Sequence, residues 1–307
     1  IFRIFTPSIK RMTMFKKTCS KGDSVLLHSP TYIGFTKSLT NNGYHIVHSP
    51  LVKDENNVYR MDFEDMEKKI RENDVKLLLF CSPHNPVGRV WKREELEKVA
   101  ALCLKYHVTL VSDEIHSDIV YKGHKHQMMA SISEEIADIT VTCTAPSKTF
   151  NVAGLQLSNI IISNPKLREK FKHEVMQAGY SQPNLMGMEA CQAAYENGEE
   201  WLEELLVYLQ GNVDFVRDYL KQEIPKIRLI EPEGTYLLWL DCRELGLSVE
   251  ELEHLVVDKA NLWLDPGFIF GAVGEGFERI NIACPRQTLR QAMDQLRDAL
   301  NAEAFLN

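Results

Sequence analysis

Residues 75–114 read VKLLLFCSPHNPVGRVWKREELEKVAALCLKYHVTLVSDE, and this stretch decides the fold. Two apolar runs, at residues 75–83 and 108–114, flank a segment at 92–107 whose apolar residues recur at helical spacing. Continuous apolar runs joined by a helix are typical of neighbouring parallel strands, which are buried on both faces. The stretch therefore predicts a strand-helix-strand unit.

The surrounding sequence repeats this alternation. Further strands are expected at residues 23–30, 44–51, 138–144 and 157–164, with a helix at 63–73. Together they predict an α/β fold with a mostly parallel central sheet. Helical patterns follow at 165–179, 185–198 and 199–223, and a smaller α+β pattern then continues to the end, with strands at 227–230, 235–241 and 279–284. We expect a large domain, residues 1–203, and a small C-terminal domain, residues 204–307, with the boundary inside the long helical segment.

The bulk composition argues against several classes of protein. The 307 residues carry a formal net charge of -8, which argues against nucleic acid or an anionic membrane as the main partner. No apolar run is long enough to span a bilayer, and residues 1–23 lack the continuous apolar core of a signal peptide. The seven cysteines are scattered and contain no C-x-x-C pair, so we expect reduced thiols in a cytoplasmic protein.

Unusual polar residues follow three of the predicted strands. Asn85 follows the first strand of the opening stretch, while Asp113 lies at the end of the second strand and His116 follows it. Ser147 and Lys148 come after the strand at 138–144. Because the carboxyl ends of parallel strands share one edge of a sheet, we expect these side chains to converge on one crevice.

An amide, a carboxylate and an amine in one crevice suit the cofactor pyridoxal 5'-phosphate (PLP). Its aldehyde forms a Schiff base with a lysine amine, and its pyridine nitrogen needs a carboxylate to stay protonated. Its phenolic oxygen needs a hydrogen-bond donor, and its phosphate needs hydroxyl and backbone N–H groups. The sequence therefore predicts PLP as the cofactor. His124 and His126 are interpreted as part of a loop, and no metal site is predicted.

Four motifs carry a resemblance to a known family: NPVGRVW, SDEIHSDIVY, SKTFNVAGLQ and GFERINIACPR. They resemble the fold-type I PLP enzymes of the class I/II aminotransferase superfamily, and most closely its MalY/PatB branch of cystathionine β-lyases. The resemblance runs from about residue 23 to the C-terminus, and the motifs occur in the family's order. Residues 1–23 match the family poorly and lack the glycine of a turn that holds the phosphate in relatives.

The resemblance implies roles for the residues at the strand ends. Lys148 matches the Schiff-base lysine, which also removes the substrate Cα proton. Asp113 matches the carboxylate that pairs with the pyridine nitrogen, and Asn85 matches the amide that donates to the phenolic oxygen. His116 stands where many aminotransferases have tyrosine, and histidine there is typical of the β-lyase branch.

Three further roles are implied in the same way. Tyr32 matches the aromatic residue that stacks on the cofactor ring, and Ser147 matches a phosphate-binding hydroxyl. Arg279 matches the arginine that binds the substrate α-carboxylate, with Arg286 as the rival for that role. Ala145 replaces a phosphate-binding serine of many relatives, and Thr144 is the candidate substitute.

Plainer interpretations of single residues stay open at this point. Asn85 precedes a proline and fits a simple turn. His116 fits a satisfied polar residue near the sheet edge, and Tyr32 fits ordinary core packing.

The resemblance implies a PLP-dependent carbon–sulfur β-lyase that releases a thiol, pyruvate and ammonia from L-cystathionine or a related cysteine S-conjugate. It also implies a homodimer with a small-molecule amino-acid substrate. Two alternatives stay open from sequence. One is an aminotransferase, which would use the same residues. The other is an inactive truncated remnant or a regulatory binding protein.

Overall fold

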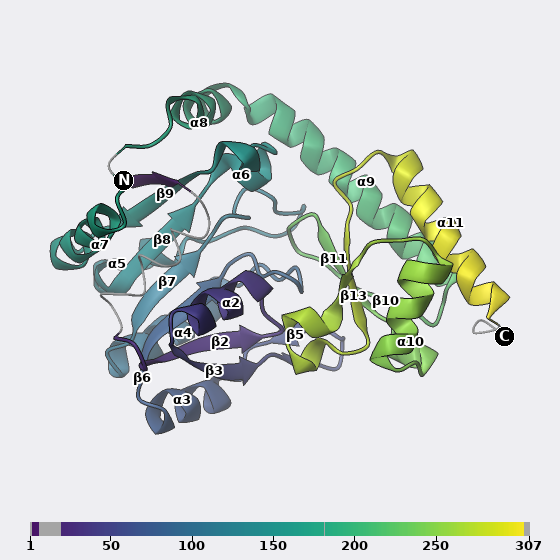
Figure 1. The fold of residues 1–307 in the computed structure, drawn as a ribbon, viewed down its shortest axis with the longest axis horizontal. Coiled ribbons are helices and arrows are strands. Elements are labelled where there is room, and N and C mark those ends of the chain that lie inside the picture. The colour runs from purple at the N-terminus through teal and green to yellow at the C-terminus, as the bar shows by residue number, and fades with distance from the viewer. Residues whose placement is uncertain (1, 6–19, 181, 304–307) are drawn as a thin grey trace.

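The computed structural model describes residues 2–5, 20–180 and 182–303. Its larger sheet has seven strands in the order β1-β9-β8-β7-β6-β2-β3 (Figure 1). Their bounds are β1 Phe2–Phe5, β2 Ser24–Ser29, β3 His45–Pro50, β6 Val75–Cys81, β7 Thr109–Asp113, β8 Thr140–Thr144 and β9 Leu157–Ile162. Strands β8, β7, β6, β2 and β3 pair in parallel, which confirms the predicted α/β fold.

Strand β9 departs from the parallel arrangement, because it pairs antiparallel with both β8 and β1. The chain leaves β8, forms the short helix α6 (Pro146–Thr149) and a 3₁₀ turn (Ala153–Leu155), and enters β9. Because β9 is antiparallel to β8, this connection starts and ends at the same end of the sheet. A connection to a parallel strand would have to cross to the opposite end. The residues of α6 therefore stay at the carboxyl edge of the parallel strands.

Both faces of this sheet are buried, as its apolar strands predict. Along β6, Leu77 and Leu79 pack into one core cluster, and Leu78 and Phe80 pack into another. The first cluster takes residues from α2 (Ile33–Asn41) and α7 (Pro165–Gln177). The second takes residues from α3 (Phe63–Glu72), α4 (Arg93–Lys105) and α5 (Glu134–Ile139). Helices thus cover the sheet on both sides and leave its carboxyl edge for a site.

The C-terminal part has its own sheet, with strands in the order β10-β11-β13-β12 and all pairs antiparallel. The bounds are β10 Arg228–Ile230, β11 Leu237–Asp241, β12 Asp265–Pro266 and β13 Phe277–Asn281. Helices α9 (Glu199–Glu223) and α11 (Arg286–Ala302) share a core cluster with β11 and β13. Helix α10 (Val249–Glu253) continues directly as one π-helical segment (His254–Lys259).

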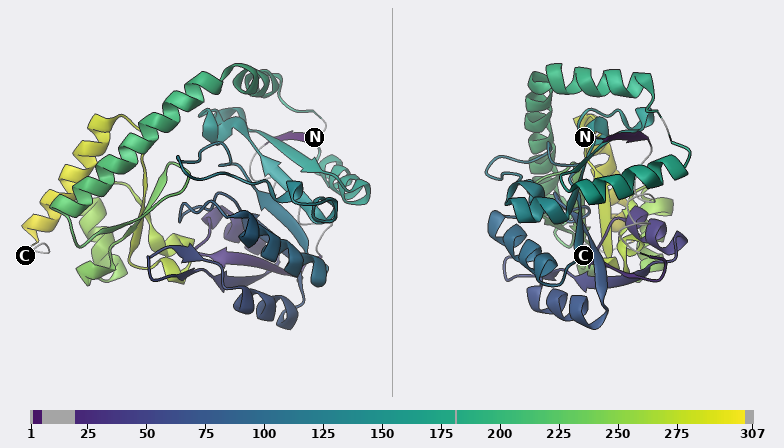
Figure 2. Two further views of the ribbon diagram at one scale, coloured as in Figure 1. Left: turned by 180° about the vertical axis from the view of Figure 1, so that it is seen from behind. Right: turned by 90° about the vertical axis from the view of Figure 1, so that its left-hand side faces the viewer.

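Helix α9 connects the two parts. It has 25 residues and follows α8 (Leu185–Asn197), so it spans about 38 Å at 1.5 Å per residue. Figures 1 and 2 show it running along one edge of the molecule from the large sheet to the C-terminal sheet. The predicted boundary near residue 203 falls within its first turns and stays a prediction.

Smaller elements complete the chain. The hairpin strands are β4 (Val52–Lys53) and β5 (Tyr59–Arg60), and further 3₁₀ turns lie at Met129–Ser131, Arg243–Leu245, Gly267–Phe270 and Ala272–Gly274. No helix in the described ranges is long and apolar enough to cross a membrane. The six cysteines in these ranges are free thiols.

A buried arginine joins the two parts behind the carboxyl edge. Arg89, in the loop after β6, donates to both carboxylate oxygens of Glu95 at 2.9 and 2.8 Å and also to the carboxylate of Glu233. Its Nε donates to the Tyr59 carbonyl at 2.8 Å, and Glu233 also accepts from the Val90 backbone N–H at 2.8 Å. The guanidinium thus connects the β6 loop and the start of α4 to the segment that leads into β11.

We expect Arg89→Gln to lower the free energy of unfolding by about 3–5 kcal/mol, because it leaves two largely buried carboxylates without their cation. Chemical denaturation of purified variants measures this. The matched control is Arg93→Gln, since Arg93 makes a solvent-exposed pair with Glu97 and should change stability by about 0.5 kcal/mol or less. Equal effects of the two substitutions would contradict the prediction.

Candidate active site

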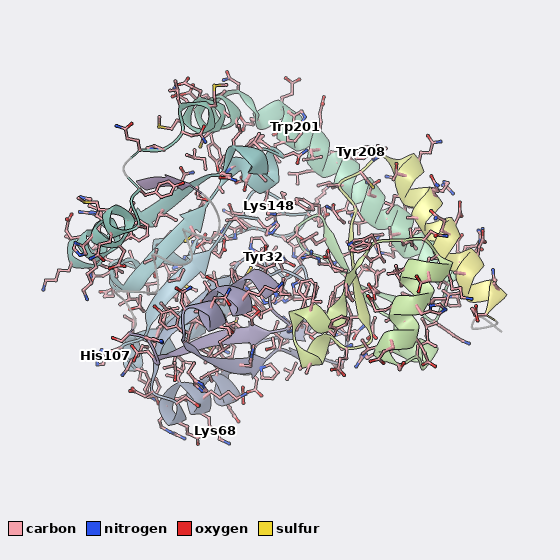
Figure 3. All side chains as sticks on the ribbon, in the orientation of Figure 1. Tyr32, Lys68, His107, Lys148, Trp201 and Tyr208 are labelled. Carbon is pink, nitrogen blue, oxygen red and sulfur yellow. The ribbon has the colours of Figure 1, made fainter. Side chains whose placement is uncertain are left out.

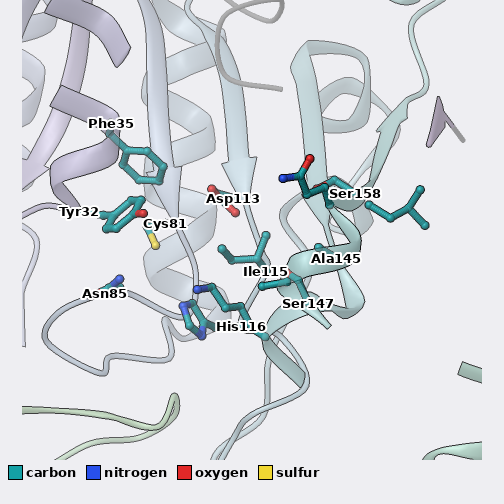
Figure 4. A pocket seen from close by; sticks show the side chains of 14 residues that line it. Tyr32, Phe35, Cys81, Asn85, Asp113, Ile115, His116, Ala145, Ser147 and Ser158 are labelled. Atoms are coloured by element: carbon teal, nitrogen blue, oxygen red, sulfur yellow. The ribbon is translucent and has the colours of Figure 1, made fainter. Parts of the chain in front are cut away.

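A pocket lies at the carboxyl edge of β6, β7 and β8, and we call it the cofactor pocket. Six of the seven predicted site residues line it: Tyr32, Asn85, Asp113, His116, Ser147 and Lys148. Figure 4 shows Tyr32 on the left, Ser147 on the right and Asp113 between them, with Asn85 and His116 lower in the view. The three strand ends therefore converge, as the sequence predicted.

Strand register explains the convergence. Cys81 at the end of β6 pairs with Asp113 at the end of β7, and Asp113 pairs with Cys143 of β8. The Ser82 N–H donates to the Asp113 carbonyl at 3.1 Å, which keeps the loop that carries Asn85 against β7. On the other side, α6 begins at Pro146 directly after β8 and places Lys148 in its single turn.

Asp113 is the buried carboxylate of the pocket. The residue is only 7% exposed, and its Oδ1 has no hydrogen-bond partner in the described part of the chain. A buried carboxylate oxygen without a donor is costly, so it marks a place for a donor that comes with a ligand. A protonated pyridine nitrogen is such a donor.

Asn85 connects the cofactor pocket to Arg279. The Nη1 of Arg279 donates to the Oδ1 of Asn85 at 2.8 Å, and arginine has only donors to offer. The amide is therefore oriented with its oxygen toward Arg279, which leaves the Nδ2 group as a donor for a ligand oxygen. Arg279 itself does not line the cofactor pocket. It lies beyond Asn85 on β13 and also pairs with Asp265, at 2.6 Å from Nη2.

His116 is buried, and its Nδ1 has no partner among the residues that the structure describes. Burial, together with the positive charges of Lys148 and Arg279, lowers the pKa of His116 to about 3. The ring is thus a neutral imidazole that meets the edge of the Tyr236 ring, with 5.8 Å between centroids. It is therefore not the fully satisfied polar residue of the plainer interpretation.

Tyr32 precedes the first turn of α2 and lines the pocket beside Phe35. The two rings meet edge to face with centroids 5.5 Å apart. Tyr32 also packs against the core cluster that contains Phe35. Both interpretations of this residue, pocket wall and core packing, are thus compatible with its position.

The wall near α6 contains residues that the sequence did not single out. Gln156 and Ser158 follow the lysine motif and line the pocket together with Ala145 and Ser147. Thr144 does not line it, and its hydroxyl instead accepts from the Asn159 amide at 3.4 Å. The string GLQLS after the lysine was the available signal, since it returns polar side chains to the same edge. Other lining residues without a distinctive signal are Phe35, Cys81, Ile115, Ala153 and Leu157.

Other candidates lie away from this pocket. The Nε of Arg286 donates to the Asn212 side chain, and its backbone N–H donates to the Tyr208 hydroxyl at 2.7 Å. His126 pairs with the buried Glu114 at 2.8 Å, and the described residues contain no group of three His, Cys, Asp or Glu side chains placed to hold a metal ion. The expectation about residues 1–23 and the phosphate turn falls largely outside the described residues.

A second cavity, which we call the distal pocket, begins at Lys148 and extends between α6, α9 and the end of β13. It is lined by Lys148, Thr149, Asn151, Trp201, Leu205, Tyr208, Leu209, Tyr236, Asn281, Ala283, Cys284 and Pro285. Figure 3 shows Lys148 and Tyr32 between the two sheets, with Trp201 and Tyr208 along α9. Lys148 thus lies between two cavities.

The residues of the cofactor pocket fit PLP. The pocket offers an amine, a buried carboxylate whose Oδ1 lacks a donor among the described residues, an amide whose oxygen is taken by Arg279, and the hydroxyl groups of Ser147 and Ser158. These are the groups that the aldehyde, ring nitrogen, phenolic oxygen and phosphate of the cofactor need.

Comparison with known proteins agrees with this chemistry. The family model for class I and II aminotransferases matches residues 6–296. The chain belongs to this family. It is 44% identical over 280 residues to cystathionine beta-lyase PatB of Bacillus subtilis, covering 91% of this chain and 72% of that protein. It is 30% identical to protein MalY of Escherichia coli, covering 97% of this chain and 76% of MalY.

A similar solved structure indicates which branch of the family the chain resembles. The PLP-containing cystalysin of Treponema denticola superposes with a TM-score of 0.96 at 37% identity, over 99% of this chain and 77% of that one. The family member described here is therefore a PLP-dependent enzyme of the carbon–sulfur β-lyase type, with the fold of the fold-type I enzymes.

Three buried histidines make the free energy of unfolding depend on pH. Burial lowers the pKa of His84 and of His116 to about 3, and that of His28 to about 4. Between about pH 7 and pH 5 the unfolded chain takes up protons at these rings while the folded chain does not. Each histidine therefore costs about 2 kcal/mol of stability over that interval.

Denaturation curves at a series of pH values test this. The free energy of unfolding should fall as the pH drops through that interval, and His84→Gln should reduce the slope by about one third of the histidine contribution. His84 is the choice because it does not line the cofactor pocket. A slope that is the same in His84→Gln and the parent protein would contradict the assignment.

Proposed function

We propose that this chain catalyses β-elimination from L-cystathionine or a related cysteine S-conjugate, releasing a thiol, pyruvate and ammonia. The main support is the Asp113 Oδ1, which lacks a hydrogen-bond partner among the described residues and lies in the same pocket as Lys148, with the Asn85–Arg279 pair at its edge. The relatives named cystathionine beta-lyase support the reaction type. His116, in the position typical of the β-lyase branch, points the same way.

The proposed cofactor contacts follow from the donors and acceptors present. Bound PLP supplies an aldehyde for the substrate amine and an electron-withdrawing ring for the carbanion that forms at Cα. Asp113 accepts the hydrogen bond of the ring nitrogen, and its charge keeps that nitrogen protonated. With the cofactor bound, Asn85 would donate Nδ2–H to the phenolic oxygen, and the hydroxyl groups of Ser147 and Ser158 would be available to hold the phosphate. Tyr32 covers one face of the ring.

The substrate is held and deprotonated by two cationic residues. Arg279 binds the α-carboxylate through two parallel N–H groups, which fixes Cα beside Lys148. The Lys148 amine takes the Cα proton, the Cβ–S bond breaks, and its electron pair leaves with sulfur as a thiolate that is then protonated. One water completes the balance, since the remaining three-carbon fragment hydrolyses to pyruvate and ammonia. The distal pocket offers Trp201, Tyr208 and Tyr236 to the sulfur substituent.

An aminotransferase is the competing function, because the family contains such enzymes and the same residues serve both reactions. The two differ in the fate of the proton that Lys148 takes. In elimination the thiolate leaves, whereas in transamination the proton returns to the cofactor side and a 2-oxo acid must accept the amino group. Dependence of turnover on an added 2-oxo acid would therefore favour the aminotransferase.

We expect PLP-loaded protein to release pyruvate steadily from L-cystathionine without any 2-oxo acid. Lys148→Ala should lower this rate by roughly 10²- to 10⁴-fold, because it removes the base for the Cα proton. Lys166→Ala, an exposed lysine on α7, is the matched control and should keep the parent rate. A coupled lactate dehydrogenase assay measures the pyruvate released. Half-transamination without pyruvate, or full activity in Lys148→Ala, would contradict the proposal.

We also propose a homodimer, with the partner copy against α8 and the first half of α9. Apolar side chains that are unusually exposed gather there: Leu185, Met186, Tyr195, Trp201 and Val207, the last 75% exposed. Exposed large apolar side chains on two consecutive helices are typical of a contact between subunits.

Light scattering at micromolar concentration should give twice the chain mass of 35.2 kDa. Val207→Glu should shift the protein toward the monomer, because it places a charge in the apolar contact. Glu250→Gln, an exposed acid on α10, should leave the dimer unchanged. A monomeric parent protein would contradict the proposal.

Two broader proposals concern the chain as a whole. We propose that the cofactor-binding domain spans residues 1–203 and the small domain residues 204–307, since helix α9 leaves the large sheet and joins the C-terminal core. We propose a cytoplasmic location, which the free thiols of six cysteines support.

A further inference from the structure

Arg279 is held from two sides before any substrate is present. Its backbone pairs with Asp265 across β12 and β13, so the two side chains start from directly opposed Cα atoms. The Asp265 Oδ2 accepts from Nη2 at 2.6 Å and from Nε at 3.3 Å, while Asn85 accepts from Nη1 at 2.8 Å. The guanidinium carbon lies 4.8 Å from the centroid of the Phe270 ring, which restricts its remaining freedom.

These contacts leave two N–H groups of the Arg279 guanidinium for a ligand. A guanidinium has five N–H groups, one on Nε and two on each Nη. Asp265 uses the Nε group and one on Nη2, and Asn85 uses one on Nη1. One N–H group remains on Nη1 and one on Nη2. A carboxylate that binds without displacing Asp265 or Asn85 can therefore accept one N–H group from Nη1 and one from Nη2, while the Nε edge stays with Asp265.

The formal charges around this site also cancel. Arg279 is paired with Asp265, and among the described residues that line the cofactor pocket only Lys148 and Asp113 are charged. In the part of the chain that the structure describes, the distal pocket adds no charged side chain besides Lys148. These lining residues therefore offer no unpaired cation to a second carboxylate of a substrate, and Asp265 would repel it.

We propose that Asp265 is a positioning and specificity residue for the substrate carboxylate. It fixes the side of Arg279 that the α-carboxylate uses, and its charge disfavours amino acids that carry a second, unbalanced carboxylate. The class of substrate admitted is then the cysteine thioethers whose sulfur substituent has no net negative charge, including the zwitterionic end of cystathionine. Aspartate and glutamate are excluded by charge. This inference rests on the proposed function for its substrate class, but the contact itself can be tested without turnover.

The test measures binding of two simple carboxylates to the cofactor-free protein by calorimetry at low ionic strength. The probes are 3-(methylthio)propanoate, which has one carboxylate, and succinate, which has two. In Asp265→Asn we expect succinate to bind roughly tenfold tighter than in the parent, the effect of removing one unit charge several ångströms away in a partly solvated site. The monocarboxylate should gain clearly less, because it carries one charge instead of two.

Controls separate charge at this position from charge in general. Glu275→Gln removes an exposed acid from the same segment and should leave both affinities unchanged. Arg279→Gln should abolish binding of both probes, which confirms where they bind. Asp265→Ser serves as a second variant in case Asp265→Asn does not fold, and should change the succinate-to-monocarboxylate ratio in the same direction.

The proposal is overturned if the ratio of the two affinities is unchanged in the folded Asp265 variant, or if Glu275→Gln changes it equally. Weaker binding of both probes in Asp265→Asn would mean that Asp265 only orients the guanidinium, and would overturn the specificity role. Because these measurements need neither PLP nor turnover, failure of the β-lyase reaction itself would show in the pyruvate assay and not here.

Discussion

The register of three neighbouring parallel strands is the constraint on which the site depends. Cys81, Asp113 and Cys143 stand opposite one another across β6, β7 and β8, so the chain leaves all three strands at one level. The Asn85 amide from the loop after β6, the Asp113 carboxylate at the end of β7 and the Lys148 amine from α6 after β8 then line one pocket. A slip of one residue in β7 would turn the Asp113 carboxylate to the other face of the sheet and empty the site of its acid.

Much of this arrangement could be predicted from sequence, because strand ends and motif order are local features. Asn85, Asp113 and Lys148 could be placed together on the rule that parallel strands share a carboxyl edge. The Arg279–Asn85 contact could not, since the two residues are 194 positions apart and belong to different sheets. The same holds for Gln156 and Ser158, which reach the pocket only because β9 runs antiparallel to β8.

The contact between the two sheets also links binding to chemistry. Asn85 has its oxygen on Arg279 and its nitrogen toward the cofactor pocket, so the groups that hold substrate and cofactor share one amide. Arg89 holds the same loop against Glu233, shortly before β11. The loop after β6 is thus attached to the C-terminal part at two points, Asn85 and Arg89. Movement between the two sheets would change the distance between the carboxylate site and the Lys148 amine.

The most direct test of this account is an absorbance titration of the purified chain with PLP, beside Lys148→Ala. The account predicts a visible band that saturates at one cofactor per chain in the parent protein and is absent in the variant, because the Lys148 amine is the group that joins the aldehyde. A band of equal strength in both proteins would mean that another amine holds the cofactor. No saturable band in either protein would contradict the assignment of this pocket to PLP.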